Sequence, residues 1–142
     1  MTLGPILALD VGTRTIGLAC TDASVRFVLP DRVLSRVGTK KDAAVVAQIC
    51  KEKRIATVIV GLPLGLNDEE TRSTRLARQV GEAVALATGL PLYWQDERYS
   101  TLEAEERMRA AGADAATRRA RIDAHAAVVI LEDWLRARTL AG

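Results

Sequence analysis

The sequence has few aromatic residues, two cysteines and a single histidine, and each shortage argues against a class of site. Trp, Tyr and Phe make up 4% of the 142 residues, too few for the base-stacking platforms of single-strand binders. Cys20 and Cys50 lack the spacing of metal ligands or of a disulfide framework, so we expect buried thiols in a reducing compartment. No Ser, Cys or His stands beside a partnered base, which argues against a side-chain nucleophile.

The sequence also lacks an excess of one charge and any long apolar run. Lys and Arg number 20 against 18 Asp and Glu, and this net charge of +2 does not by itself indicate a polyanionic partner. Neither a signal peptide nor an apolar span of about eighteen residues is found, so we expect a cytoplasmic protein that does not bind membranes. The hydrophobic fraction of 49% is enough for a proper core, and no repeat or linker divides the chain. We therefore expect a single domain over residues 1–142.

Strand-like and helix-like patterns alternate along the chain. Apolar runs of strand length lie at 6–10, 16–20, 27–34, 55–60 and 90–97. Amphipathic helix patterns lie at 39–53, 67–88, 100–112 and 118–137. The strand–helix–strand order in the second half implies parallel strands. These patterns predict an α/β fold in which a mixed five-stranded sheet, three antiparallel strands followed by β-α-β crossovers, is flanked by helices.

Several residues mark the expected ends of these elements. Pro30 predicts that the third strand lies at an edge or beside a bulge. Thr39 is the expected cap of the first helix, and Asn67 with Glu70 forms a plausible capping pair for the second, which Gly89 should close. A further capping box at 100–103 should begin the third helix.

Three acidic residues stand where this fold would bring side chains together. Asp10 ends an otherwise apolar strand pattern, and Glu97 ends the last strand. Functional groups in such sheets gather beyond the carboxyl ends of parallel strands. Asp123 begins the apolar face of the last helix, so packing that face on the sheet would bring its carboxylate there as well. The rest of that face is Ala127, Ile130 and Trp134.

Carboxylates that converge in this way require a compensating cation. Like charges repel and raise one another's pKa unless a cation neutralises them, and a site made of oxygen ligands suits Mg²⁺ or Mn²⁺. Spacing alone leaves a second interpretation open, in which the three are unrelated surface or capping acids. For Asp10 that interpretation is an acid capping the turn at Gly12 and Thr13.

Four segments together resemble the signature blocks of the YqgF/RuvX family. In chain order they are LALDVGTRTIGLACTD, VIVGLPLG, QDERYST and IDAHAAVVIL. Each block alone is weak, because D-x-G-T also occurs in sugar kinases and actin-like ATPases, but four in order are a strong signal. The resemblance implies an RNase H-like fold. The family is described as Holliday junction resolvases or pre-16S rRNA nucleases, so the resemblance also implies an enzyme that hydrolyses phosphodiester bonds.

The resemblance also implies a catalytic role for the same three acids. Asp10, Glu97 and Asp123 match the family's catalytic positions and would hold two Mg²⁺ or Mn²⁺ ions when substrate is bound, with Asp10 bridging both ions. The implied substrate is nucleic acid. One candidate is an rRNA precursor, free or on ribosomal particles, that is processed at its 5′ end during ribosome biogenesis. The other is branched DNA in recombination. The sequence does not choose between RNA and DNA, or between a monomer and a homodimer.

Basic and aromatic residues near these blocks are candidate nucleic-acid contacts. Arg14, in the turn after Asp10, is expected to contact phosphate, and a solvated turn is the alternative. The other candidates are Arg98, Tyr99, Arg118, Arg119 and Arg121. For Arg98, a structural salt bridge explains the residue at least as well as phosphate binding does. For the three C-terminal arginines, the alternative is that they lie on solvated helix faces. His125 is expected to be a surface residue rather than a proton shuttle. The segment 67–70 departs from the family's acidic glycine turn, so substrate contact by the loop 61–67 is in doubt.

Two other functional classes compete with a nuclease. The D-x-G-T hairpin also belongs to actin-like phosphotransferases, but those proteins hold nucleotide between two such domains and 142 residues supply one. A non-catalytic nucleic-acid-binding or ribosome-associated module would not need all three acids. We therefore expect a nuclease.

Overall fold

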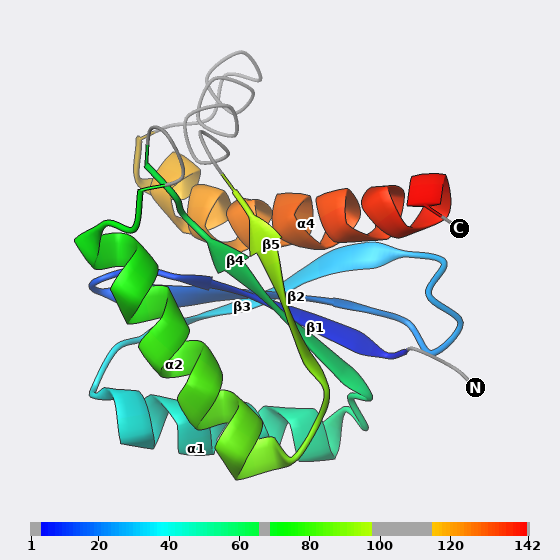
Figure 1. The fold of residues 1–142 in the computed structure, drawn as a ribbon, viewed down its shortest axis with the longest axis horizontal. Helices are drawn as coiled ribbons and strands as arrows, with labels where there is room; N and C mark the ends of the chain where they lie inside the picture. Colours follow the sequence, from blue (N-terminus) through cyan, green and yellow to red (C-terminus); the bar gives the residue numbers. More distant parts are fainter. Residues whose placement is uncertain (1–3, 66–68, 98–114, 142) are drawn as a thin grey trace.

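The computed structural model describes residues 4–65, 69–97 and 115–141, with side chains in the last helix described for 125–138. A five-stranded sheet forms its centre, in the order β3-β2-β1-β4-β5. Helices α1 and α2 cover one face of the sheet and α4 crosses the other (Figure 1). This is the mixed α/β architecture that the sequence predicts. No helix among the described residues is both long and apolar enough to cross a membrane.

The N-terminal hairpin forms as its apolar runs predict. Strand β1 (Ile6–Val11) pairs antiparallel with β2 (Thr15–Thr21), and the Gly12 N–H donates to the Thr15 carbonyl across the turn at 2.8 Å. The third strand, β3 (Val28–Ser35), lies at the sheet edge, and its register with β2 shifts between Leu18 and Ala19. Because a proline cannot donate to a neighbouring strand, Pro30 fits this irregular edge position.

The second half of the sheet is parallel. Strand β4 (Thr57–Leu62) pairs with β1, and β5 (Leu92–Asp96) pairs with β4, both in parallel. Each strand begins two residues later than its apolar run suggested. All six residues of β4 are buried, because helices cover both faces of this central strand.

The first helix, α1 (Thr39–Glu52), corrects one of the expected caps. Its N-cap is Gly38, which makes no side-chain capping bond, and Thr39 is already inside the helix. The carboxylate of Asp42, in the first turn, accepts hydrogen bonds from Arg36 Nε and from the Val37 N–H. This carboxylate therefore fixes the entry to α1 in place of a threonine cap.

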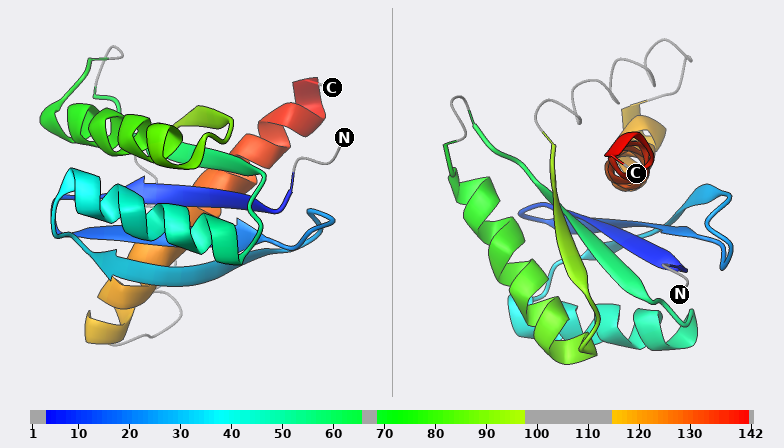
Figure 2. Two further views of the ribbon diagram at one scale, coloured as in Figure 1. Left: turned by 90° about the horizontal axis from the view of Figure 1, so that it is seen from below. Right: turned by 45° about the vertical axis from the view of Figure 1, so that its right-hand side comes forward.

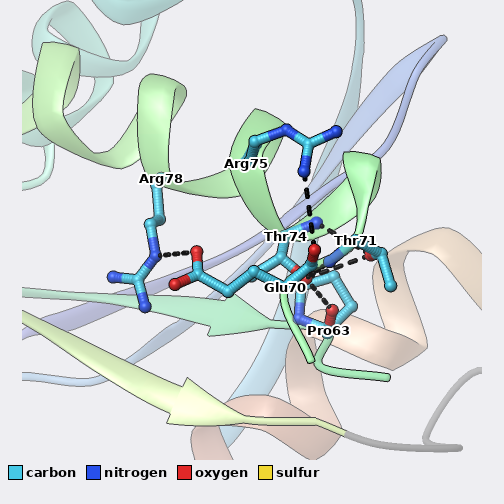
Figure 3. Close-up of polar contacts among 6 residues, drawn as sticks. All are labelled: Pro63, Glu70, Thr71, Thr74, Arg75 and Arg78. Carbon is cyan, nitrogen blue, oxygen red and sulfur yellow. Dashed lines mark hydrogen bonds and ion pairs between the residues drawn. The ribbon is translucent and has the colours of Figure 1, made fainter. Parts of the chain in front are cut away.

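The second helix, α2 (Arg72–Thr88), begins five residues later than expected. Its N-cap is Thr71, which forms a reciprocal capping box with Thr74, so the expected cap by Asn67 and Glu70 is wrong (Figure 3). A threonine at the third helical position can replace the usual Glu or Gln because its hydroxyl reaches the N-cap N–H. The C-terminal expectation is confirmed: Gly89 closes the helix in the left-handed conformation, with φ of 69°.

Side chains alternate between two hydrophobic layers on the sheet. Leu7, Leu9 and Val11 of β1 pack with α1 and α2, whereas Ile6 and Ala8 pack with the last helix, α4 (Ala115–Ala141). On α4 the expected apolar face is confirmed, since its residues Ala127, Ile130 and Trp134 are at most 6% exposed. This alternation decides which polar side chains of the strands face α4. The capping box expected at 100–103 lies outside the described residues.

Candidate functional site

Asp10 interrupts an otherwise apolar strand and faces α4. It follows Ile6 and Ala8 on the side of β1 that packs against α4, because side chains alternate along a strand. It is half-buried, and its neighbours Leu9 and Val11 face the opposite layer. Asp10 therefore projects from the sheet toward α4, one residue before β1 ends.

Glu97 reaches the same face of the sheet from β5. Its backbone N–H donates to the Leu62 carbonyl at 3.1 Å, which extends the pairing with β4 by one residue beyond Asp96. Its side chain leans over Gly61, since an ideal Cβ built on that glycine would lie 3.6 Å from Glu97 Cγ. The same Cβ would overlap Ile130 of α4. Glu97 thus occupies the layer between the sheet and α4, and its Oε1 atom is buried.

Gly61 lies between the two acids in the sheet. The parallel register pairs Leu9 with Val60, so the next step places Asp10 beside Gly61, and Gly61 pairs on its other side with Gln95. Strands β1 and β5 are therefore separated by β4 alone, about 10 Å from one another. With no Cβ on Gly61, Ile130 and the Glu97 side chain can approach the strand that separates the two acids.

Gly61 is also the position whose importance sequence reasoning missed. The family block VIVGLPLG contains it, but the sequence alone did not indicate a role for it. The available signal was a glycine inside an apolar strand, which often marks a close approach of another backbone or side chain. Here the approaching groups are Ile130 and Glu97.

The first part of α4 lies near the ends of the strands that carry these acids. In Figure 1 α4 begins on the side of the sheet toward which β1 and β4 point, and it runs back across the sheet. Asp123 belongs to this first part, but its side chain lies outside the described residues. The structure therefore brings Asp10 and Glu97 to one face, and Asp123 lies on α4, the helix that crosses that face.

His125 differs from the surface residue that the sequence predicted. It is only half-exposed, and its Nε2 atom is buried, with no hydrogen-bond partner within the part of the chain that the structure describes. The cause is its neighbourhood in α4, because Ala126 and Ala127 are buried immediately after it. A ring on this stretch of the helix cannot avoid partial burial.

The candidate nucleic-acid contacts are placed unequally. Arg14 is exposed in the β1–β2 turn, as a phosphate contact requires, and its carbonyl accepts from the Arg36 N–H at 2.8 Å. Arg98 and Tyr99 lie outside the described residues. Arg118, Arg119 and Arg121 lie on α4, but their side chains also fall outside the described part.

The donor set at this face suits a hard divalent cation. Asp10 and Glu97 offer carboxylate oxygens, the ligands that Mg²⁺ and Mn²⁺ prefer. Among the side chains that the structure describes, no group of three potential metal ligands is present, and the third expected acid, Asp123, is outside that set. The two described carboxylates are thus compatible with a metal site, for which Asp123 would complete the ligands.

Comparisons with known proteins identify relatives over nearly the whole chain. The family model "RuvX: Holliday junction resolvase" matches residues 4–137. An Anaeromyxobacter sp. protein named "Putative pre-16S rRNA nuclease" is 43% identical over 132 residues, covering 93% of this chain and 96% of the relative. A protein of the same name from Leifsonia xyli is 36% identical over 137 residues, covering 96% and 88%.

Solved structures support the fold. A Thermus thermophilus RuvC bound to a Holliday junction substrate superimposes with a TM-score of 0.57 at 20% identity, covering 94% of each chain. A second Thermus thermophilus RuvC structure gives 0.54 at 15% identity, covering 94% of this chain and 95% of that one. The sheet order and the helix on each face are therefore those of an RNase H-like fold. By its sequence match over residues 4–137, the chain belongs to the RuvX family.

Proposed function

We propose that this chain is a divalent-metal-dependent nuclease that hydrolyses phosphodiester bonds in structured nucleic acid, with Asp10, Glu97 and Asp123 as its catalytic acids. The observation that carries the proposal is the placement of Asp10 and Glu97 on one face of the sheet, on either side of Gly61. Family membership supports it, because the curated relatives are named as nucleases.

The chain's own residues would mainly position charge. Asp10 and Glu97 would present oxygens from strands about 10 Å apart, and Asp123 would add a third carboxylate from α4. Two divalent cations bound there would activate a water and neutralise charge on the scissile phosphate and the leaving oxygen. Burial of the surrounding layer, with Ile130 and Trp134 at most 6% exposed, limits how far these acids can move.

The proposed substrate is the 5′ end of a pre-16S rRNA, and the relatives' names favour it over branched DNA. The family description makes a Holliday junction the second candidate. Cleavage would take place in the cytoplasm, on rRNA alone or within a ribosomal particle. Resolving a junction symmetrically needs two active sites and hence a homodimer, whereas end processing needs one.

A side-by-side cleavage assay tests both the chemistry and the substrate. The purified protein is incubated with Mg²⁺ or Mn²⁺ and with three probes: an rRNA precursor, a four-way DNA junction and linear single strands. We expect cleavage of the precursor that chelation abolishes. Cleavage of the junction alone would replace the rRNA assignment with the second candidate.

Single carboxamide variants then test the acids. Asp10→Asn, Glu97→Gln and Asp123→Asn should each reduce the rate at least a hundredfold while circular dichroism shows an intact fold. Asp96→Asn is the matched control, because Asp96 precedes Glu97 on β5, is exposed and alternates to the other face. Mg²⁺ or Mn²⁺ should also raise the melting temperature of the wild-type protein, but not of Asp10→Asn. Unchanged cleavage by Asp10→Asn would disprove the proposed mechanism.

A further inference from the structure

A groove lies on the opposite side of the sheet from the acids, but at the same end of the strands. The β1–β2 turn, the loop before α1 and the first two turns of α2 line it, through Thr13, Arg36, Gly38, Arg72, Arg75 and Gln79 among others. Its volume is about 510 Å³. Both Figure 1 and the left view of Figure 2 show the β1–β2 turn and the starts of α1 and α2 at one end of the molecule.

The charge of this groove is positive. Its lining includes three arginines and no acidic residue. Arg36 is already neutralised, since it bonds to Asp42 at 2.8 Å and to the Gly12 carbonyl at 3.2 Å. The uncompensated charge therefore comes from Arg72 and Arg75.

Arg72 and Arg75 lack acidic partners among the described residues. Both are exposed, and the contact of Arg75 is a hydrogen bond of 3.5 Å to the backbone carbonyl of Glu70 (Figure 3). The carboxylate of Glu70 points away to Arg78 and bonds it at 2.7 Å. The nearby acids Glu70 and Asp42 are thus engaged by other arginines, and Glu69, two residues before the N-cap of α2, does not line the groove.

The position of these two arginines works against helix stability. The N-terminus of a helix carries partial positive charge and favours acidic residues, so cations in the first turns are unfavourable. The first turn of α2 contains no acidic residue, and Arg72 is its first residue. An anion bound in the groove would reverse this electrostatic penalty, because both arginines and the helix dipole would then attract it.

The groove is also close to Asp10 along the chain. Thr13 lines it and is three residues beyond Asp10, a distance of at most about 11 Å along the chain. A nucleic-acid strand advances about 3.4 Å per nucleotide, so a strand that passes from Asp10 around the β1–β2 turn reaches the groove within a few nucleotides. Arg14, exposed in that turn, lies on the path.

We propose that Arg72 and Arg75 form a second phosphate-binding site, which holds the backbone of the substrate strand a few nucleotides away from the bond that is cut. This site rests on the proposed nuclease function, because it assigns the substrate of the same enzyme a second point of attachment. The groove offers no base-stacking platform, since no aromatic side chain lines it, and we expect its two free arginines to bind the phosphate backbone. Its contribution is to affinity and register, and the acids alone carry out hydrolysis.

Binding measurements test the site independently of cleavage. An Asp10→Asn background prevents turnover, and fluorescence anisotropy with a labelled RNA stem-loop bearing single-stranded tails gives Kd over a series of salt concentrations. The groove variant, Arg72→Gln with Arg75→Gln, keeps similar helix propensity. We expect its affinity to fall about tenfold and the slope of log K against log salt to fall by about 1.4 to 1.8, which corresponds to two phosphate contacts.

The matched control removes two exposed cations at the other end of the strands. Arg26→Gln with Lys51→Gln changes the net charge by the same amount, in the β2–β3 turn and in the last turn of α1. We expect less than a threefold change in Kd for the control. Equal losses in the control and groove variants would overturn the proposal, because general charge would then account for both.

Three further measurements distinguish strand binding from other roles of the arginines. The melting temperature of the groove variant should equal or exceed that of the parent, whereas a lower value would indicate that the arginines stabilise the fold. In the active background the groove variant should raise KM with kcat within threefold. Loss of affinity for inorganic pyrophosphate or a mononucleotide, without loss for RNA, would overturn the assignment to a strand. If Asp10→Asn still cleaves RNA, the proposed mechanism fails, and the groove is then tested by the same anisotropy measurement with a nuclease-resistant phosphorothioate probe.

Discussion

Ile130 of α4 lies directly over Gly61 of β4, so closely that a Cβ on the glycine would overlap the isoleucine Cδ1 atom. Both residues are buried, and Ile130 is 1% exposed. This contact sets the height of α4 above the strand that separates Asp10 from Glu97. The distance of α4, which carries Asp123, from the strands of Asp10 and Glu97 therefore depends on the absence of a single methyl group at Gly61.

Gly61→Ala is expected to lower the free energy of unfolding by about 2 kcal/mol, because overpacking a buried contact forces neighbouring groups apart. Chemical denaturation measures this change. Cleavage should fall as well, since displacing Ile130 moves α4, which carries Asp123. Gly38→Ala is the control for stability, because a Cβ there meets nothing within 4 Å.

Because the overlap involves mainly the Cδ1 atom of Ile130, removing that atom should restore stability to Gly61→Ala. Ile130→Val removes Cδ1 and alone should cost about 1 kcal/mol. Combined with Gly61→Ala, it should restore part of the lost stability, which a double-mutant cycle would detect as favourable coupling. Strict additivity of the two changes would show that the overlap is relieved elsewhere.

The ion pair of Arg36 and Asp42 predicts a specific sensitivity to acid. Burial raises the pKa of Asp42, but hydrogen bonds from Arg36 and from the Val37 N–H lower it by more, so the pKa lies below its ordinary value. A carboxyl group whose pKa is lower in the folded state stabilises the protein above its unfolded pKa of about 3.9. That stability is lost as the pH falls through the lowered folded value.

Asp42→Asn should therefore destabilise the protein at pH 7 by about 3 kcal/mol, because Arg36 would keep its charge in a site where its side chain is 11% exposed. The difference between variant and wild type should shrink between pH 4 and pH 2, as denaturation at each pH would show. Asp133→Asn is the control: its bond to Arg136 is a surface pair worth less than about 1 kcal/mol. An Asp42→Asn loss as small as the control's would contradict a stabilising pair.

The capping box of α2 provides a stability prediction with a conservative control. Thr71 Oγ1 accepts from the Thr74 N–H at 3.3 Å, and the Thr71 N–H donates to Thr74 Oγ1 at 3.0 Å. Thr71→Ala should lower stability by about 1 kcal/mol because the helix loses its N-cap acceptor. Thr71→Ser should retain most of it. Since Arg72 and Arg75 follow this cap, Thr71→Ala should also weaken RNA binding to a smaller extent than the double arginine variant.

Sequence patterns predicted the sheet and its partner faces because these depend on local periodicity. The apolar run of β1 is buried on both faces of the sheet, and the spacing of Ala127, Ile130 and Trp134 buries one face of α4, so the local pattern identifies both sets of residues. Helix starts were predicted less well, because several residues compete to cap each one. Thr39 had the right chemistry, yet Asp42 and Arg36 outcompete it through contacts that only folding creates.

For the candidate site, too, features set by local sequence pattern could be predicted, and features set by contacts between elements could not. Strand direction predicted that Asp10 and Glu97 lie at one edge of the sheet, and the structure adds that both face α4. The roles of Gly61 and of the arginines at the start of α2 could not be predicted, because they depend on which atoms of other elements approach them. Partial burial of His125 was missed for the same reason.

Cys50 provides the last prediction, in which pH and chemical reactivity are linked. Burial raises the pKa of the Cys50 thiol to about 11, so at pH 8 almost none of it is the reactive thiolate. A thiol whose pKa is higher in the folded state stabilises the protein below its unfolded pKa, and this contribution is lost as the pH rises toward 11. In a Cys20→Ser variant, iodoacetamide at pH 8 should therefore leave the folded protein unmodified and alkylate it fully in about 6–8 M urea. Mass spectrometry gives the modified fraction, and rapid alkylation of the folded chain would show that α1 opens to expose Cys50.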